Sequence, residues 1–128
     1  MTRFQEAILQ VVRIVPYGKV VSYGQVAAYV GAPRAARQVG WAMHSMAGEP
    51  DFPWWRVLNN AGRITIRGNQ INAAQLQREL LENEGVVINN ALELDIAKYR
   101  FHPHETTLRS LKLDPEYVKT ILTKYDIG

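Results

Sequence analysis

The strongest constraint on the fold is a pair of helical patterns separated by a three-residue break. Ser22 and Gln25 have capping-box spacing, which predicts the start of a helix that ends near Gly31. After Gly31-Ala32-Pro33, helix-forming residues run from Arg34 to Met46. Because proline lacks the N–H that the first turn of a helix leaves unpaired, Pro33 is suited to the start of the second helix. This spacing is typical of a helix-turn-helix motif.

Helices are also expected on both sides of this motif. Thr2 and Gln5 form another capping box, and the apolar periodicity that follows stops at Pro16-Tyr17-Gly18. Asp114-Pro115 is a cap and first-turn pair that predicts a final helix. A further helix from Asn72 to Glu84, with Gly85 just past its end, is expected to turn three leucines inward. These are Leu76, Leu80 and Leu81.

Short β segments complete the predicted architecture. Residues 19–21 are rich in valine, and residues 56–59 and 63–66 flank the turn signal Asn60-Ala61-Gly62, which predicts a hairpin. Residues 86–88 are a candidate last strand. A hairpin beside a helix-turn-helix would be a wing, so the predicted fold is mainly α with a small β wing. We expect one winged helix-turn-helix domain over residues 1–98 and a C-terminal helical extension over residues 99–128.

Composition restricts the function classes. The 128 residues are 47% hydrophobic, with no apolar run long enough to span a membrane and no pattern typical of a signal peptide, so a cytoplasmic, membrane-free globule is expected. The chain has no cysteine, which excludes disulfides, thiolate metal sites and cysteine nucleophiles. Residues 1–68 hold eight Lys and Arg against three Asp and Glu, whereas residues 69–128 hold seven against nine. The basic half is the candidate nucleic-acid face.

The start of the second predicted helix suits contact with DNA. Arg34 and Arg37 are three residues apart and therefore share a face. Ala35, Ala36 and Gly40 leave little bulk around them. A helix with so few large side chains can bring its backbone close to a groove wall, with the two arginines near phosphates or base edges.

Three stretches carry a family resemblance: GKVVSYGQVAAYVGAPRAARQVGWAM, PWWRVLNNAGRI and LLENEGV. They resemble the DNA-binding domain of the O6-alkylguanine-DNA alkyltransferases, and specifically their alkyltransferase-like relatives. In the true alkyltransferases the fingerprint is Pro-Cys-His-Arg-Val, whose cysteine accepts the alkyl group with help from the histidine and a glutamate. Here residues 53–57 read Pro-Trp-Trp-Arg-Val. With no thiol in the chain, alkyl transfer is excluded, and we predict a protein that is not an enzyme.

The resemblance implies a set of DNA-binding and pocket residues. Tyr23 matches the tyrosine that rotates the phosphate on the 3′ side of the target, and Arg37 matches the finger that fills the space left by an extruded nucleotide. Arg34 is expected to support DNA binding. Trp54 takes the cysteine position and would wall a pocket for the flipped base, with Arg67 stacked over the guanine as a cation–π partner. The predicted lesion pocket consists of Met43, Trp54, Val57 and Arg67.

Other notable residues receive structural interpretations. Trp41 is expected in the core and Trp55 in a packing role. Glu84 matches the family glutamate but is expected to have lost both of its partners, which leaves it a structural role. His102 and His104 flank a proline in a loop without a third ligand at helical spacing, so no metal is predicted, and no cofactor is expected.

The expected function is recognition of O6-alkylguanine in double-stranded DNA by nucleotide flipping, without chemical repair. We expect a monomer, and the resemblance implies that such a protein marks lesions for nucleotide excision repair proteins. Two alternatives remain open. A helix-turn-helix transcription regulator would read guanines of undamaged DNA through Arg34 and Arg37 in the major groove. A hydrolase acting on a flipped base would need a carboxylate in the pocket, for which Glu84 is the positional candidate.

Overall fold

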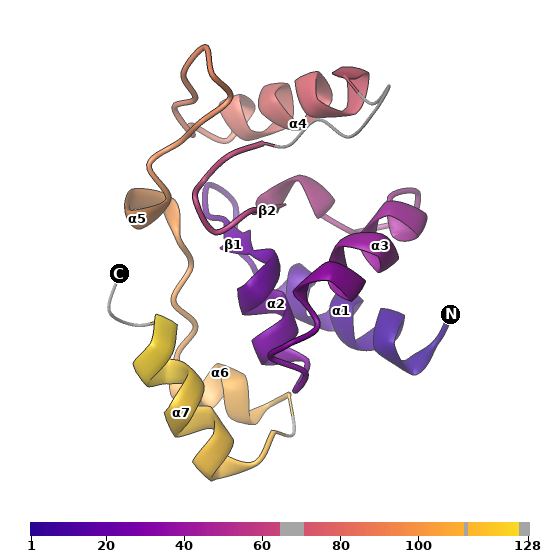
Figure 1. Cartoon of the computed structure of the whole chain (residues 1–128), viewed down its shortest axis with the longest axis vertical. Helices are drawn as coiled ribbons and strands as arrows, with labels where there is room; N and C mark the ends of the chain where they lie inside the picture. The colour runs from indigo at the N-terminus through magenta and orange to yellow at the C-terminus, as the bar shows by residue number, and fades with distance from the viewer. Residues whose placement is uncertain (65–70, 112, 126–128) are drawn as a thin grey trace.

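Three helices form the centre of the structure, a computed structural model that describes residues 1–64, 71–111 and 113–125. These are α1 (Arg3–Arg13), α2 (Tyr23–Tyr29) and α3 (Ala36–Met46), which pack against one another (Figure 1). Both predicted capping boxes form: the Thr2 hydroxyl accepts from the Gln5 N–H at 3.1 Å, and the Ser22 hydroxyl accepts from the Gln25 N–H at 3.0 Å. Local sequence therefore fixes where α1 and α2 begin.

The start of α3 differs from the prediction. The helix begins at Ala36, so Pro33 and Arg34 lie before it. The Ala35 N–H donates to the Ala32 carbonyl at 2.9 Å, which closes a tight turn over residues 32–35. Because this turn uses the proline's fixed φ, the first helical turn forms only afterwards. Arg37 consequently lies at the second position of α3, and Arg34 lies in the loop that precedes it.

The described strands pair differently from the predicted hairpin. Strand β1 (Val21–Ser22) pairs in parallel with β2 (Val57–Leu58), with Val21 opposite Val57. Arg63, in the second predicted strand, instead bridges to Glu93 in antiparallel fashion. Thr65 and Ile66 lie outside the described residues. The partners of these segments come from distant parts of the chain, which the local turn signal could not indicate.

Helix α4 (Ile71–Asn83) and the segments beside it form a second layer. Helix α4 follows β2, and a 3₁₀ turn, η1 (Trp54–Arg56), lies between α4 and the central helices (Figure 1). Gly85 adopts φ +89° just after α4, as predicted for a helix end. Leu81 is fully buried and Leu80 is half-buried, but Leu76 is 47% exposed, which corrects the expectation of three inward leucines. Residues 86–88 form a loop rather than a strand.

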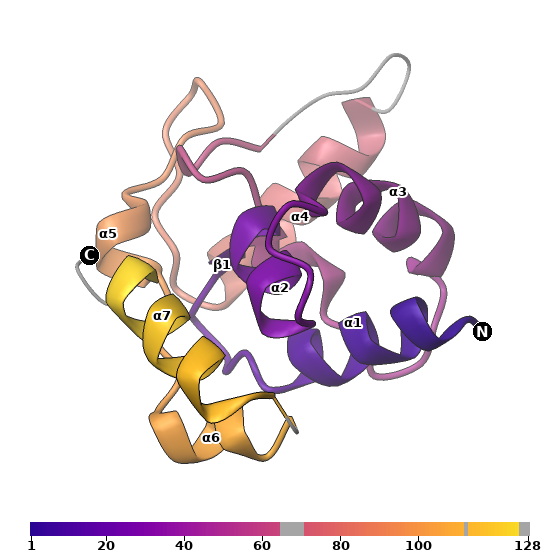
Figure 2. The ribbon, with the colours of Figure 1, turned by 60° about the horizontal axis from the view of Figure 1, so that its bottom comes forward.

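The C-terminal helices pack against the central bundle. After the short α5 (Ile96–Tyr99), α6 (Glu105–Arg109) leads into α7 (Pro115–Tyr125), and α7 lies beside α2 in both ribbon views (Figure 2). The Tyr117 hydroxyl donates to the Ala28 carbonyl at 2.5 Å, and Val118 is completely buried in the same apolar cluster as α1–α3. Within the described residues, no helix combines the length and the apolar character needed to cross a membrane.

Candidate nucleic-acid interface

A cavity of about 420 Å³ lies between α3, η1 and α4. Its walls come from four places in the sequence: the first residue of α2, one face of α3, the segment η1–β2, and the first two turns of α4. The lining side chains are mostly apolar. They are Tyr23, Gly40, Met43, His44, Ala47, Trp54, Val57, Ala73, Ala74, Leu76 and Gln77.

The structure brings several of the predicted site residues together around this cavity. Trp54 is half-buried on one wall, and Met43 and Val57 are buried beside it. Tyr23 lines the same cavity, although sequence reasoning placed it at the DNA backbone rather than in the pocket. Arg67 lies outside the described residues. These positions give the cavity an aromatic wall and an apolar floor, which is the surface that stacking against a planar base requires.

Helix α3 presents three different faces. Val39, Met43 and Met46 face the core, because residues four and three apart lie on one side of a helix. Gly40, Met43, His44 and Ala47 face the cavity. The remaining face is open to solvent and carries Arg37 and Trp41.

The exposure of Trp41 corrects the expectation that this residue lies in the core. Sequence reasoning placed it in the core, yet 60% of the residue is exposed. Trp41 is two positions from the buried Val39, which puts the two side chains on nearly opposite sides of α3. Arg34 and Arg37 are exposed as well, so the outer face of α3 and the loop before it join two guanidinium groups to a large aromatic ring.

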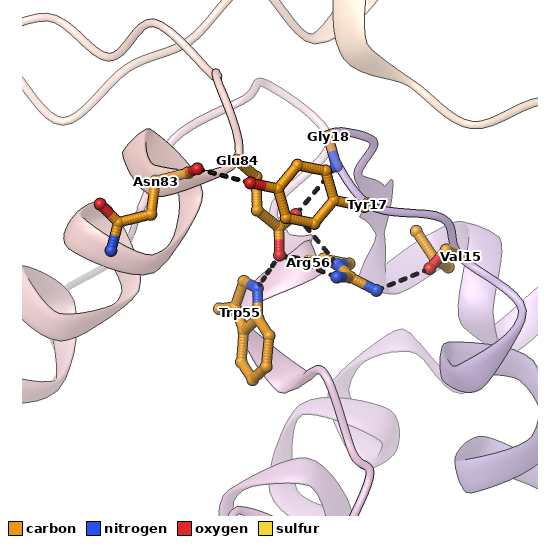
Figure 3. A network of polar contacts seen from close by, with 7 residues as sticks. All are labelled: Val15, Tyr17, Gly18, Trp55, Arg56, Asn83 and Glu84. Atoms are coloured by element: carbon orange, nitrogen blue, oxygen red, sulfur yellow. Dashed lines mark hydrogen bonds and ion pairs between the residues drawn. The ribbon is translucent and has the colours of Figure 1, made fainter.

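The two adjacent tryptophans point in different directions from η1. Their rings meet edge to face, with centroids 6.1 Å apart and an interplanar angle of 87°. Trp54 lines the cavity and packs on the central apolar cluster. Trp55 packs instead on a second apolar cluster, which includes Ala74 and Leu81 of α4. Its indole N–H donates to the Glu84 carboxylate at 2.7 Å (Figure 3). Trp55 therefore does more than fill space.

Glu84 is the centre of a polar network that includes Trp55 and Arg56 (Figure 3). Arg56 donates to it from Nε and from Nη2, the latter at 2.8 Å, and the Gly18 N–H donates at 2.9 Å. The side chains of Arg56 and Glu84 are only 15% and 5% exposed. Arg56 also reaches the Val15 carbonyl at 2.9 Å, which ties η1 to the end of α1. Glu84 lacks the cysteine and histidine partners of the family motif, as expected, but three other groups donate to it instead.

The network stabilises the charged form of Glu84. Burial by itself would raise the pKa of this carboxyl, but hydrogen bonds from Arg56, the Gly18 N–H and Trp55, together with the Arg56 charge, hold the pKa below its ordinary value of 4.5. Glu84 is not one of the described residues that line the cavity. A paired carboxylate outside the cavity is poorly placed to act as the base that the hydrolase alternative requires.

Comparison with known proteins decides the family. The 6-O-methylguanine DNA methyltransferase DNA-binding domain family matches residues 3–86. Alkyltransferase-like protein 1 of Schizosaccharomyces pombe is 40% identical over 120 residues, which cover 92% of this chain and 95% of that protein. The chain belongs to the alkyltransferase-like family.

Two further relatives agree with this placement. The DNA base-flipping protein of Escherichia coli is 37% identical over 99 residues, covering 77% of this chain and 74% of that protein. The crystal structure of S. pombe Atl1 in complex with damaged DNA containing O6-carboxymethylguanine has a TM-score of 0.74 and 39% identity, and covers 80% of this chain and 98% of that one. The mainly α prediction and the family resemblance are both confirmed.

Family membership gives the network a chemical meaning. By the resemblance of residues 53–57 to the alkyltransferase fingerprint, Trp54 would take the place of the alkyl-accepting cysteine and Trp55 that of the histidine. The indole N–H of Trp55 can donate a hydrogen bond but cannot accept a proton. Trp55 bonds to Glu84 but, unlike the histidine that the resemblance implies at this position in the alkyltransferases, has no group that could accept a proton.

Sequence reasoning missed the contribution of α4 to the cavity of this alkyltransferase-like protein. Ala73, Leu76 and Gln77 line it and have the i, i+3, i+4 spacing of one helical face, which was the available signal. Gln77 is 9% exposed, and its amide nitrogen donates to the carbonyls of Trp55 at 3.1 Å and Val57 at 2.9 Å. Those two bonds hold the η1–β2 wall against α4.

Proposed function

We propose that this protein recognises O6-alkylguanine in double-stranded DNA by turning the modified nucleotide out of the helix and into the cavity between α3, η1 and α4. The observation that carries the proposal is the convergence of Met43, Trp54 and Val57 on one cavity beside a helix with exposed arginines. At about 420 Å³ the cavity falls in the size range of small-molecule sites.

The free-energy cost of nucleotide flipping explains why the proposed site needs both a stacking surface in the cavity and a side chain that fills the gap in the duplex. Extrusion of a nucleotide costs a few kcal/mol of lost stacking and pairing. Trp54 offers a replacement stacking surface for the base, and the apolar side chains of Met43 and Val57 suit the added alkyl group. Arg37, exposed near the start of α3, is the proposed finger that fills the vacated position, and Arg34 is proposed to contact phosphate.

The remaining assignments follow the family resemblance. Tyr23 is proposed to turn the 3′ phosphate and, because it also lines the cavity, to meet the edge of the flipped nucleotide. Arg67 is proposed as a cation–π partner for the guanine. The S. pombe relative crystallised with DNA containing O6-carboxymethylguanine supports this substrate class.

The proposed function ends with recognition. Alkyl transfer to a protein thiol needs a cysteine, and this chain has none. A protein that holds the lesion without removing it can mark the site for other enzymes, and we propose that nucleotide excision repair proteins are the ones recruited. Recruitment would be tested separately from lesion binding.

The deciding experiment compares two duplexes that differ by one O6-methylguanine, at fixed salt because phosphate contacts make affinity salt-dependent. We expect much tighter binding to the modified duplex, with the methyl group intact when the DNA is recovered. Equal affinity for the two duplexes would reject lesion recognition and favour a helix-turn-helix regulator. Loss of the methyl group or release of a free base would reject the non-enzymatic assignment.

A further inference from the structure

Trp41 occupies an unusual place for a large apolar side chain. The residue is 60% exposed and lies in the middle of α3, on the face that does not touch the core. Single exposed apolar residues are common on protein surfaces and need no explanation by themselves. What distinguishes Trp41 is its position relative to the cavity and to Arg37.

The geometry of α3 fixes that position. Going round the helix from the cavity face, His44 comes first, then Arg37, then Trp41, because each residue advances by the same angle. Trp41 is four residues after Arg37, so it lies about one turn, or about 6 Å, further along the axis on a neighbouring strip. In angle about the helix axis, Arg37 therefore lies between His44 of the cavity face and Trp41.

We propose that Trp41 packs against the unpaired base that remains on the opposite strand when a nucleotide is flipped. This rests on the proposed function. If the flipped base fills the cavity and Arg37 fills the gap, the next group round α3 faces the strand across the gap. An indole ring there supplies a stacking surface to a base that has lost its partner.

Charge selects DNA over other occupants of this face. Arg37 is one turn before Trp41 on α3, Arg34 lies in the loop before that helix, and both are exposed. The half of the chain that holds them carries eight Lys and Arg against three Asp and Glu. Two copies of such a basic face would repel each other, whereas a duplex supplies phosphates for the arginines. The exposed aromatic ring then meets a partner that also offers apolar, stackable surface.

The test is a cycle that removes either the ring or the base. Trp41→Ala is compared with wild type on a duplex with O6-methylguanine opposite cytosine, and on the same duplex with an abasic site opposite the lesion. We expect Trp41→Ala to weaken binding roughly 5- to 150-fold on the first duplex, the range of one base–aromatic stack. On the abasic duplex the loss should shrink to less than about 3-fold.

Controls separate the ways in which the inference could fail. Trp41→Phe should retain most of the affinity, and Val87→Ala, which trims an apolar residue that is 71% exposed on a different part of the chain, should change nothing. Equal losses on both duplexes, or no loss on either, would overturn the role of Trp41 while leaving the proposed function intact. Failure of wild type to prefer the lesion would reject the proposed function itself.

A second copy of the chain is the competing occupant. Sedimentation without DNA should show the same mass for wild type and Trp41→Ala. A dimer that dissociates on substitution would overturn the inference, because the ring would then be covered by protein. Melting temperatures of the two proteins should agree within a few degrees, since an exposed side chain contributes little to the core.

Discussion

The two tryptophans of η1 are neighbours in sequence but belong to opposite kinds of environment. Trp54 is on an open, mostly apolar cavity whose lining meets solvent. Trp55 faces a closed polar network in which Glu84, Arg56 and the Gly18 N–H satisfy one another. One side of the 3₁₀ turn borders an open cavity, which is the proposed ligand side, and the other side is held in place by hydrogen bonds.

This contrast explains how the family fingerprint can lose its reactive residues and keep its shape. Arg56 and Glu84 connect η1, the end of α1 and the end of α4, and neither is at the reacting position. Trp55 retains one hydrogen bond to that framework. Trp54, by contrast, lines the cavity and packs on the central apolar cluster. The framework and the cavity should therefore respond separately to mutation.

Arg56→Ala is expected to have the largest effect on stability. The substitution leaves Glu84, whose side chain is 5% exposed, without its ion-pair partner, and breaking such a buried pair costs about 3–5 kcal/mol. Urea unfolding monitored by circular dichroism would measure the loss. Arg78→Ala is the matched control, because the Arg78–Glu82 pair is 30% and 43% exposed and should contribute at most about 1 kcal/mol. Similar losses in both variants would contradict the framework role.

Trp54→Ala is expected to affect binding more than folding. Loss of one stacking surface should weaken affinity for the O6-methylguanine duplex by about 1–3 kcal/mol, with a much smaller change on the undamaged duplex. Fluorescence anisotropy with labelled DNA would measure both affinities, at protein concentrations where circular dichroism shows the variant folded. An equal loss on the two duplexes would mean that Trp54 serves general DNA binding instead of the lesion.

Trp55→Phe, in contrast, is expected to affect folding stability more than binding. Phenylalanine preserves much of the packing but removes the N–H that donates to Glu84 at 2.7 Å. Hydrogen bonds to charged groups contribute about 1.5–3 kcal/mol, and because Arg56 and Gly18 still satisfy the carboxylate, we expect a loss near the lower end. Lesion affinity should change less than in Trp54→Ala. A larger binding defect than that of Trp54→Ala would show that Trp55 belongs to the ligand side.

The parts of this molecule that sequence reasoning predicted are those set by local chemistry. The Thr2 and Ser22 capping boxes, the Gly85 helix end and the Asp114-Pro115 helix start each depend on residues within one or two turns. The pairing of β1 with β2, by contrast, joins residues 36 positions apart in register, Val21 with Val57. A turn signal at residues 60–62 could not reveal that partner.

At the candidate site, too, contacts between residues distant in the sequence could not be predicted from local patterns. Trp41 was expected in the core because tryptophan is usually buried, yet the spacing of Val39, Met43 and Met46 already defined a core face that excludes it. The bond between Trp55 and Glu84 spans 29 residues, and no pattern within either segment indicates it. The family resemblance aligned both residues but carried no information on what a tryptophan would do in place of a histidine.

Acid should weaken the framework without a direct effect on the cavity. The pKa of Glu84 is held below 4.5 in the folded protein, so the ionised carboxylate stabilises the fold when the pH is above its ordinary pKa. This contribution is lost as the pH falls through the lower pKa of the folded state. Urea unfolding across pH 3–6 should show a shallower acid decline for Glu84→Gln than for wild type. Glu79→Gln, which alters an exposed carboxylate on α4, the helix that ends just before Glu84, should retain the wild-type slope.

Trp54→Cys is expected to produce no gain of alkyl transfer, the smallest effect of the series. A cysteine there would supply the missing sulfur, but the nucleophile is the thiolate, and a neighbouring base is needed to form it at neutral pH. Trp55 offers only an N–H, and Glu84 is already bound by Arg56 and Gly18. Mass spectrometry after incubation with the O6-methylguanine duplex would detect a methylated protein. Alkyl transfer by this single variant would show that the cavity can activate a thiol without a neighbouring base. It would contradict the proposal that Trp55 and Glu84 only hold η1 in place.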